Sequence, residues 1–249
     1  MTLKEYTKKR RFNVTSEPAG KDSKAKKPHN NLIYVVQKHR ATSLHYDFRL
    51  EWKGVLLSWA VPKGPSLDPS VKRLAMHVED HPLDYASFEG VIPEGEYGGG
   101  TVMVWDQGTW IPESPDVDAA LARGDLKFTL MGKKLRGSWV LVRTRGYGKS
   151  AWQDSSADPG KSWLLIKHRD EFASTEDIAA EKARSVASNK LLADIARSGG
   201  GNVEKAATGD PAGEPVRAAA AKPAVRSKKP ASGKKSMAPS RPSAGRASK

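Results

Sequence analysis

Polar and apolar residues alternate without a break from Leu44 to Trp52. Alternate side chains of a β-strand point to opposite sides, so this period of two predicts a strand with one apolar and one polar face. The polar face carries His45, Asp47, Arg49 and Glu51. Most such faces are solvated and need no special chemistry. A solvated face is usually made of Lys, Glu, Thr and Ser, however, whereas this one places an imidazole, a carboxylate and a guanidinium in sequence.

Seven further segments have the composition of short strands: 32–37, 55–61, 73–79, 100–105, 126–130, 139–144 and 163–167. Turn signals separate several of them, at 53–54, 106–108 and 131–132. Helical patterns are confined to 116–123, stopped by Gly124, and 189–197, stopped by Gly199 and Gly200 with Ser188 as the expected N-cap. Eight short strands at hairpin spacing predict an all-β barrel or sandwich.

Composition divides the chain into four parts. Residues 1–31 are polar and rich in Lys, and their Pro and Gly residues favour an extended arm packed on the domain rather than a helix. All seven Trp lie between Trp52 and Trp163, which places the packed core in residues 32–175. A helical extension follows at 176–201. Residues 202–249 are rich in Ala, Lys and Pro and contain no aromatic residue, so we expect a disordered basic tail.

The formal charge is +14, and the stretch from Val203 onward holds 11 basic against 3 acidic residues. Such a balance favours nucleic acid as the partner, although solubility alone would also account for it. The chain contains no cysteine, which excludes disulfides, thiolate nucleophiles and Cys-based metal sites. Neither a membrane span nor a signal peptide is recognisable, so the expected location is the cytoplasm, without membrane association.

His39 lies six residues before His45, at the end of the preceding strand and across a short turn. A hairpin would bring it beside His45 and Asp47. Two imidazoles and one carboxylate leave coordination positions open for water and substrate, as catalytic metals require. Mixed nitrogen and oxygen ligands suit Mn²⁺, Zn²⁺ or Fe²⁺ better than Ca²⁺. Non-haem iron oxygenases use the same ligand set, so these three residues do not by themselves specify the reaction.

A second polar cluster runs from Arg73 to Tyr85. Its alternation predicts that Leu74, Met76 and Val78 face one way and that Arg73, Ala75, His77 and Glu79 face the other, with His81 and Tyr85 on the loop that follows. Together with Lys63, these residues can supply cations and hydrogen-bond donors to a phosphate. The Gly-rich segment 94–100 is interpreted as a tight turn, because a strand follows it rather than the helix of a phosphate-binding loop.

The motifs HYDFRLEW, VEDHPLDYA, PEGEYGGG and GKKLRGSWVLVR resemble the phosphoesterase domain of bacterial DNA ligase D over residues 3–168. The resemblance implies a small, closed or nearly closed β-barrel of about eight strands with a few short flanking helices, here followed by the disordered tail. It implies manganese, or another divalent transition metal, held by His39, His45 and Asp47. By the same resemblance Arg49 and His81 contact the scissile phosphate, Arg10 keeps a basic substrate-binding position, and supporting catalytic positions fall on Tyr85, Lys63, Arg73 and Glu79. Arg11 stands where the family usually has Asp.

The activity implied is a two-step trimming of DNA 3′ ends in non-homologous end joining. A 3′-ribonucleoside phosphodiesterase step leaves a 3′-phosphate, and a phosphomonoesterase step then leaves a ligatable 3′-hydroxyl. The substrates would be DNA or RNA/DNA 3′ ends of primer-templates, and the protein partners a separate DNA ligase and an end-bridging protein. We expect a stand-alone, nucleoid-associated monomer whose basic tail holds it on DNA. The alternative is a non-catalytic DNA-end-binding accessory module.

Overall fold

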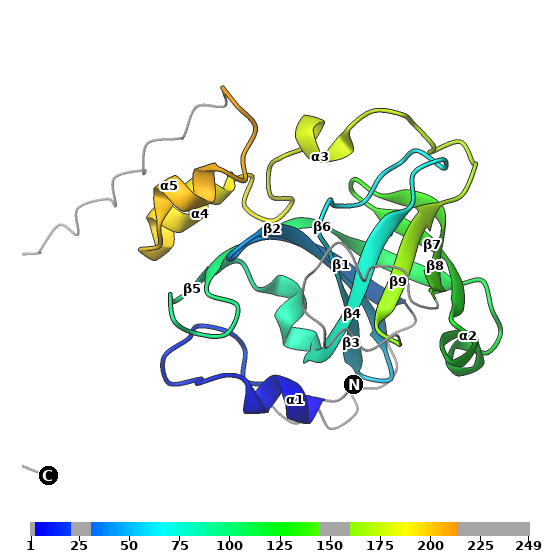
Figure 1. The fold of residues 1–249 in the computed structure, drawn as a ribbon, viewed down its shortest axis with the longest axis horizontal. Coiled ribbons are helices and arrows are strands. Elements are labelled where there is room, and N and C mark those ends of the chain that lie inside the picture. Colours follow the sequence, from blue (N-terminus) through cyan, green and yellow to red (C-terminus); the bar gives the residue numbers. More distant parts are fainter. Residues whose placement is uncertain (1–2, 21–30, 145–159, 214–249) are drawn as a thin grey trace, which may run out of the picture. The chain divides into compact units, whose positions relative to one another are not determined.

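The computed structural model describes residues 3–20, 31–144 and 160–213 (Figure 1), all within one compact unit that spans residues 1–219. Its helices and strands are, in chain order, α1 (Leu3–Lys8), β1 (Leu32–Arg40), β2 (Leu44–Trp52), β3 (Val55–Val61), β4 (Arg73–Pro82), the 3₁₀ helix η1 (Leu83–Ser87), β5 (Gly90–Ile92), β6 (Gly100–Pro112), α2 (Val117–Arg123), β7 (Asp125–Gly132), β8 (Arg136–Arg143), β9 (Ser162–Lys167), α3 (Ile178–Glu181), α4 (Leu192–Gly199) and α5 (Val203–Ala207).

The strands form one antiparallel sheet in the order β1-β2-β3-β4-β9-β8-β7-β6-β5, and β6 also pairs with β1. This last pairing closes a barrel of eight strands, as the sequence predicted, and leaves β5 as an extra strand beside the start of β6. The turn between β2 and β3 consists of Lys53 and Gly54, whose φ angles of 49° and 80° are those of a tight hairpin turn. All eight predicted strands exist, and β5 was missed because it is only three residues long.

Aromatic side chains fill the interior of the barrel. Each of the largest is at most 1% exposed: Tyr34, Phe48, Trp59, Trp105, Trp110, Phe128 and Trp139. The apolar face of β2 points into this core, as its alternation predicted. Its polar face is not solvated, because Asp47, Arg49 and Glu51 are also buried. A second apolar cluster covers part of the outer face of the barrel, and it consists of Tyr6, Leu56, Tyr85, Phe88, Ile92 and Val102.

The predicted turn at 106–108 is wrong, because β6 runs through it to Pro112. The register of β1 against β6 shifts there, with Val36 opposite Asp106 and Gln37 opposite Val104, which is a β-bulge. Asp106 is fully buried and accepts hydrogen bonds from the Tyr34 hydroxyl (2.6 Å) and from the backbone N–H groups of Lys134 and Leu135 (both 2.9 Å). Asp106, a residue type that signals a turn in the sequence, thus accepts buried hydrogen bonds inside a long strand.

The predicted facing of β4 holds for Ala75 and His77, which share one face, but not for Glu79, which contacts Lys9 and Arg10 of the N-terminal arm on the outer face. Ala75 lies in the barrel core, and the His77 ring stacks on Trp59 at 5.0 Å between centroids, so these residues face inward. Further along, Ser58 pairs with Val78 but Leu56 pairs with His81, which leaves β4 with one extra residue. This bulge carries His81 to the outer face within the strand, not on a loop, and Tyr85 lies in η1 rather than in a loop.

The helices differ from expectation mainly at the ends of the chain. Asp116 caps α2 and Gly124 ends it in the left-handed conformation, as predicted. Helix α4 begins after Leu191 rather than at Ser188, and the Asp210 carboxylate accepts from the N–H groups of its first residues. The N-terminal arm contains α1, and residues 202–213 contain α5, so neither stretch is wholly irregular. Residues 214–249, the rest of the predicted tail, lie outside the described residues.

The C-terminal helices pack on the barrel and on β5. Leu192, Ile195 and Ala206 contribute to the barrel core. Gly199 and Gly201 approach Val91 of β5 so closely that a Cβ on either would lie 2.8 Å from the Val91 side chain. Among the described helices, none is long and apolar enough to cross a membrane.

Replacing Asp106 by Ala should lower the free energy of unfolding by about 2–4 kcal/mol, because it leaves the backbone N–H groups of Lys134 and Leu135 without their acceptor. It also removes the shorter of the two hydrogen bonds of the buried Tyr34 hydroxyl, which keeps only the one to the Leu135 carbonyl oxygen at 3.1 Å. Urea denaturation measures this. Asp118→Ala is the matched control, because its carboxylate is 54% exposed and its ion pair with Lys53 and its hydrogen bond from Nε1 of Trp52 both lie at the surface, so we expect a change below about 1 kcal/mol. Equal decreases in the free energy of unfolding in the two variants would contradict the stabilising role assigned to the hydrogen bonds of Asp106.

Candidate functional site

Three potential metal ligands meet where β1 and β2 pair. The hairpin register places His39 directly opposite His45, with Asp47 two residues further along β2. Oδ2 of Asp47 lies 3.6 Å from Nδ1 of His39 and 3.7 Å from Nε2 of His45. One atom from each residue can be chosen so that all three lie within 4.8 Å of one another. The sequence therefore identified the residues that the fold brings together.

Backbone carbonyls orient both imidazoles. Nε2 of His39 lies 2.8 Å from the carbonyl oxygen of Gly98, and Nδ1 of His45 lies 3.1 Å from that of Ser43. Because a carbonyl only accepts, each of these nitrogens carries the proton. The other nitrogen of each ring faces Asp47 and, in the neutral imidazole, is the one that can bind a metal. A ligand histidine typically donates its second N–H to such an acceptor, so both rings have the tautomer that metal binding requires.

The guanidinium of Arg49 connects Asp47 to the rest of the site. Arg49 is 2% exposed, and its Nη2 lies 3.2 Å from Oδ2 of Asp47. It also donates to Oε1 of Gln37 and Oγ of Ser58, both at 2.8 Å. Burial alone would raise the pKa of Asp47, but the charge of Arg49 and the two histidines outweigh it and hold that pKa far below its usual range. Asp47 is therefore ionised near neutral pH.

His81 lies between two guanidinium groups. Its Nδ1 is 2.9 Å from Nη1 of Arg49 and 2.9 Å from the carbonyl oxygen of Glu79, and its Nε2 is 3.2 Å from Nη2 of Arg10. Burial lowers the pKa of His81 well below its ordinary value, and the charges of Arg49 and Arg10 lower it further. The imidazole is consequently neutral near pH 7. The carbonyl of Glu79 favours a proton on Nδ1, which leaves Nε2 as the acceptor toward Arg10. In this tautomer Nη1 of Arg49 donates to Ser58 and is in contact with the His81 ring without donating to it.

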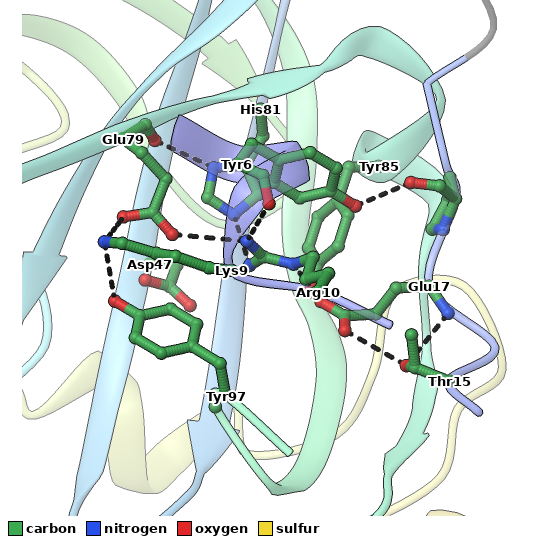
Figure 2. Close-up of polar contacts among 12 residues, drawn as sticks. Tyr6, Lys9, Arg10, Thr15, Glu17, Asp47, Glu79, His81, Tyr85 and Tyr97 are labelled. Atoms are coloured by element: carbon green, nitrogen blue, oxygen red, sulfur yellow. Dashed lines mark hydrogen bonds and ion pairs between the residues drawn. The ribbon is translucent and has the colours of Figure 1, made fainter. Parts of the chain in front are cut away.

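The N-terminal arm covers the site and supplies Arg10 (Figure 2). Nε of Arg10 donates to Glu17 at 2.8 Å, and its Nη1 lies 3.3 Å from Glu79. The Glu17 carboxylate, itself buried, also accepts from the Tyr85 hydroxyl at 2.9 Å and from the Thr15 hydroxyl at 3.0 Å. Burial opposes the charge on Arg10, yet Glu17 raises its pKa above the ordinary value. The Arg10–Glu17 pair lies within the arm, and the arm is tied to the barrel side by the ion pair of Arg10 with Glu79 and by the hydrogen bond from the Tyr85 hydroxyl to Glu17.

These residues line one cavity of about 330 Å³. Of the sequence-predicted site residues it contains Arg10, His39, His45, Asp47, Arg49, Glu79, His81 and Tyr85. Lys63 and Arg73 are not among its lining residues. Lys63 is exposed on the turn after β3, and Arg73 lies eight residues before His81, about 26 Å away along an extended strand. The structure therefore does not bring these two residues to the cavity.

Sequence reasoning missed Gln37, Ser58 and Tyr97. Gln37 stands two residues before His39 and so shares its face of β1, a signal that the strand alternation offered. Its amide nitrogen donates to the carbonyl oxygens of Tyr85 and Phe88, and its amide oxygen accepts from Arg49. Ser58 lies across from Arg49 in the β2–β3 pairing. Tyr97 comes from the Gly-rich turn, which we interpreted only as a connection.

Arg11, which replaces the usual family Asp, points to that same turn. Its Nε donates to Oε2 of Glu96 at 3.1 Å, and its Nη2 pairs with Oε1 of Glu96. The arm therefore contacts the Gly-rich turn through a bidentate ion pair at this position.

Comparison with known proteins agrees with this geometry. Residues 37–143 match the family described as the DNA ligase D 3′-phosphoesterase domain. Relatives include the multifunctional non-homologous end joining protein LigD of Pseudomonas aeruginosa, 48% identical over 219 residues, or 86% of this chain and 24% of that protein. The LigD DNA repair protein of Mycobacterium tuberculosis is 50% identical over 45% of this chain and 15% of its own length. LigD of Mycolicibacterium smegmatis is 38% identical over 71% and 22%. The chain thus spans less than a quarter of the length of these relatives.

Replacing Glu17 by Ala should release the N-terminal arm, because it leaves the buried Arg10 guanidinium without its closest carboxylate. We expect the amide protons of residues 6–17 to exchange about 100-fold faster, as measured by hydrogen exchange, while the barrel strands keep their protection. Glu94→Ala is the control, since that side chain is 68% exposed and its contact with Lys205 is 3.9 Å long. Unchanged exchange in the Glu17 variant would show that the arm is held by other contacts.

Proposed function

We propose that this chain, which belongs through residues 37–143 to the DNA ligase D 3′-phosphoesterase family, is a metal-dependent hydrolase of phosphate esters at DNA 3′ ends in non-homologous end joining. One observation carries the proposal. A prospective three-ligand metal site and two groups suited to a phosphate, Arg49 and His81, line the same cavity. The proposed substrates are primer-template ends that carry a 3′-ribonucleoside or a 3′-phosphate, and the product is a 3′-hydroxyl.

The donor set of His39, His45 and Asp47 fits a divalent transition metal, for which Mn²⁺ is our proposal. Nδ1 of His39 and Nε2 of His45 already face the Asp47 carboxylate, so little rearrangement is needed to collect the three ligands. Two nitrogens and one oxygen match the preference of such ions, and three protein ligands leave positions for substrate. When bound, the metal would polarise a phosphoryl oxygen and activate water.

Arg49 and Arg10 would offset the charge that develops on the phosphoryl group. Four contacts, to Asp47, Gln37, Ser58 and His81, fix the Arg49 guanidinium before substrate arrives. Groups fixed in this way cost no reorganisation during the reaction, which is the main source of electrostatic catalysis. The salt bridge from Arg10 to Glu17 likewise fixes Arg10.

His81 is the proposed proton carrier for the leaving oxygen. Its neutral resting form accepts at Nε2, and the negative charge of a bound phosphate would favour a proton there. Because two guanidinium groups surround the ring, the proton on Nε2 would be held weakly and passed readily to the leaving oxygen. Both proposed steps need such a donor, first for a nucleoside and then for the 3′-hydroxyl.

The formal charge of +14 supports DNA as the substrate. Association with a separate ligase and an end-bridging protein remains part of the proposal for the whole protein. The alternative of a non-catalytic end-binding module predicts DNA binding without hydrolysis, and the presence of the three prospective metal ligands together with Arg49 and His81 in one cavity speaks against it.

Mn²⁺ should bind the full chain at a single tight site, and Asp47→Ala or His45→Ala should weaken that binding by more than about 100-fold, because each removes a direct ligand. Isothermal titration calorimetry measures this. The matched control is His168→Ala, since His168 contacts Ser138 outside the cavity, and its affinity should equal that of the unmodified chain. An unchanged affinity for Mn²⁺ in both Asp47→Ala and His45→Ala would contradict the proposed metal site.

A primer-template that ends in one ribonucleotide should be converted first to a 3′-phosphate and then to a 3′-hydroxyl in the presence of Mn²⁺, with no conversion in EDTA. Gel electrophoresis resolves the products. Arg49→Ala should slow both steps by about 10²–10³-fold or more, the usual effect of removing one charge-stabilising donor. Binding of the DNA with no hydrolysis by the unmodified chain would instead favour the non-catalytic module.

A further inference from the structure

A second cavity continues from the first one. It has a volume of about 570 Å³ and lies between α1, the middle of β4 and the Gly-rich turn. The two cavities share Val78, Glu79 and Tyr97 as lining residues. The two cavities therefore adjoin at these residues, and a strand whose end reaches Arg49 and His81 would pass Tyr97 to enter the second cavity.

Tyr97 stands at the junction with its ring accessible. It is 48% exposed, which makes it one of the few large exposed hydrophobic residues in the described part of the chain. Its hydroxyl accepts from Nζ of Lys9 at 3.2 Å, and the Arg10 guanidinium lies 5.5 Å from the centre of its ring (Figure 2). Lys9 also bonds Oε2 of Glu79 at 3.0 Å. Nζ of Lys9 also lies 4.7 Å from the centre of the Tyr97 ring. The ring is thus held through its hydroxyl and by the two cations over it, while about half of the residue remains exposed.

The turn that carries Tyr97 is fixed on both sides of it. Glu96 forms the ion pair with Arg11, and the carbonyl oxygen of Gly98 accepts from His39. Gly98 has φ of 78°, and a Cβ on Gly99 would lie 2.8 Å from the carbonyl oxygen of Pro93, so this compact turn requires glycine at both positions. An exposed aromatic ring on a fixed turn loses little conformational entropy when a ligand covers it.

The charges that face the second cavity suit a polyanion. Lys8, Lys9 and Lys161 provide cations, and Glu5 and Glu79 provide carboxylates. The Glu79 carboxylate is already paired with Lys9 and Arg10. Lys8 and Lys161 are therefore placed to contact a phosphodiester backbone, while the open ring of Tyr97 suits a flat, apolar surface. A nucleotide strand presents phosphates and flat bases in alternation, and single-strand binding grooves contact the phosphates with cations and the bases with aromatic rings.

We infer that Tyr97 is a base-stacking platform, on which the nucleobase of the nucleotide that bears the scissile 3′-phosphate rests while its strand continues along the second cavity past Lys161. This inference deepens the proposed function, because it assumes that the phosphate binds at Arg49 and His81. It assigns to the Gly-rich turn a role in holding the 3′ end, without preference for the identity of the base, since every base has a face that can stack.

The test is a binding cycle with the full chain in EDTA, so that bound DNA is not hydrolysed. Fluorescence anisotropy compares a primer-template whose 3′-phosphorylated terminal nucleotide carries adenine with one whose terminal nucleotide is abasic. The unmodified chain should bind the adenine end about 5- to 100-fold more tightly, the usual worth of one base on an aromatic ring. Tyr97→Ala should bind both ends equally and weakly.

Two controls separate stacking from other roles of the ring. Tyr97→Phe keeps the ring and loses the hydrogen bond from Lys9, and it should still discriminate between the two ends. Phe172→Ala removes another exposed aromatic residue, 37% exposed and absent from both cavities, and should behave as the unmodified chain does. Lys161→Met should weaken binding of both ends by the same factor and reduce the salt dependence.

The inference is overturned if Tyr97→Ala still prefers the adenine end, or if Tyr97→Phe loses the preference as completely as Tyr97→Ala. Neither outcome depends on hydrolysis. Failure of the unmodified chain to convert the same 3′-phosphorylated end in Mn²⁺ would instead overturn the proposed function and leave the stacking result standing.

Discussion

The buried guanidinium of Arg49 is the contact on which the outer face of the barrel depends. It joins β1 through Gln37, β3 through Ser58, β4 through His81 and its own strand through Asp47. It also lies 5.0 Å from the centre of the Tyr85 ring in η1. A cation at 2% exposure is tolerated only if nearly all of its donors are paired. Arg49 therefore constrains the positions of all four partners, which are Asp47, Gln37, Ser58 and His81.

Strand β2 contributes to two different interiors. Its apolar face completes the aromatic core of the barrel, and its polar face lies under η1, β5 and the N-terminal arm. Because side chains alternate along a strand, each residue of β2 faces either the aromatic core or the outer face, and the residues on one face do not change the environment of the other face. The cavity is consequently outside the barrel, on a wall made rigid by strands that are hydrogen-bonded on both sides. The cover, in contrast, is held by a few specific contacts such as the ion pair of Arg10 with Glu79.

The sequence was informative where short-range geometry decides the outcome. The alternation of β2 and the hairpin between His39 and His45 follow from strand pleating and a short turn, so the order of residues along the chain was enough to group the prospective ligands. The outward position of His81 could not be predicted in this way, because it results from one extra residue in β4 that appears only in the pairing with β3. Asp106 was misread for a related reason, since a buried bulge uses the same residue types as an exposed turn. The contributions of Glu17 and Tyr97 depend on tertiary packing of segments that carry no periodic pattern.

Closure of the barrel also affects how the protein behaves when many copies are close together. Eight strands have neighbours on both sides, and in the described part of the chain the edge strand is β5, which has three residues and is followed by Pro93. The end of α4, with glycines packed against Val91, lies over this short edge. Exposed edges are the usual starting points for sheet-to-sheet aggregation. A basic protein that becomes concentrated on a polyanion is thereby protected from growing into a shared sheet.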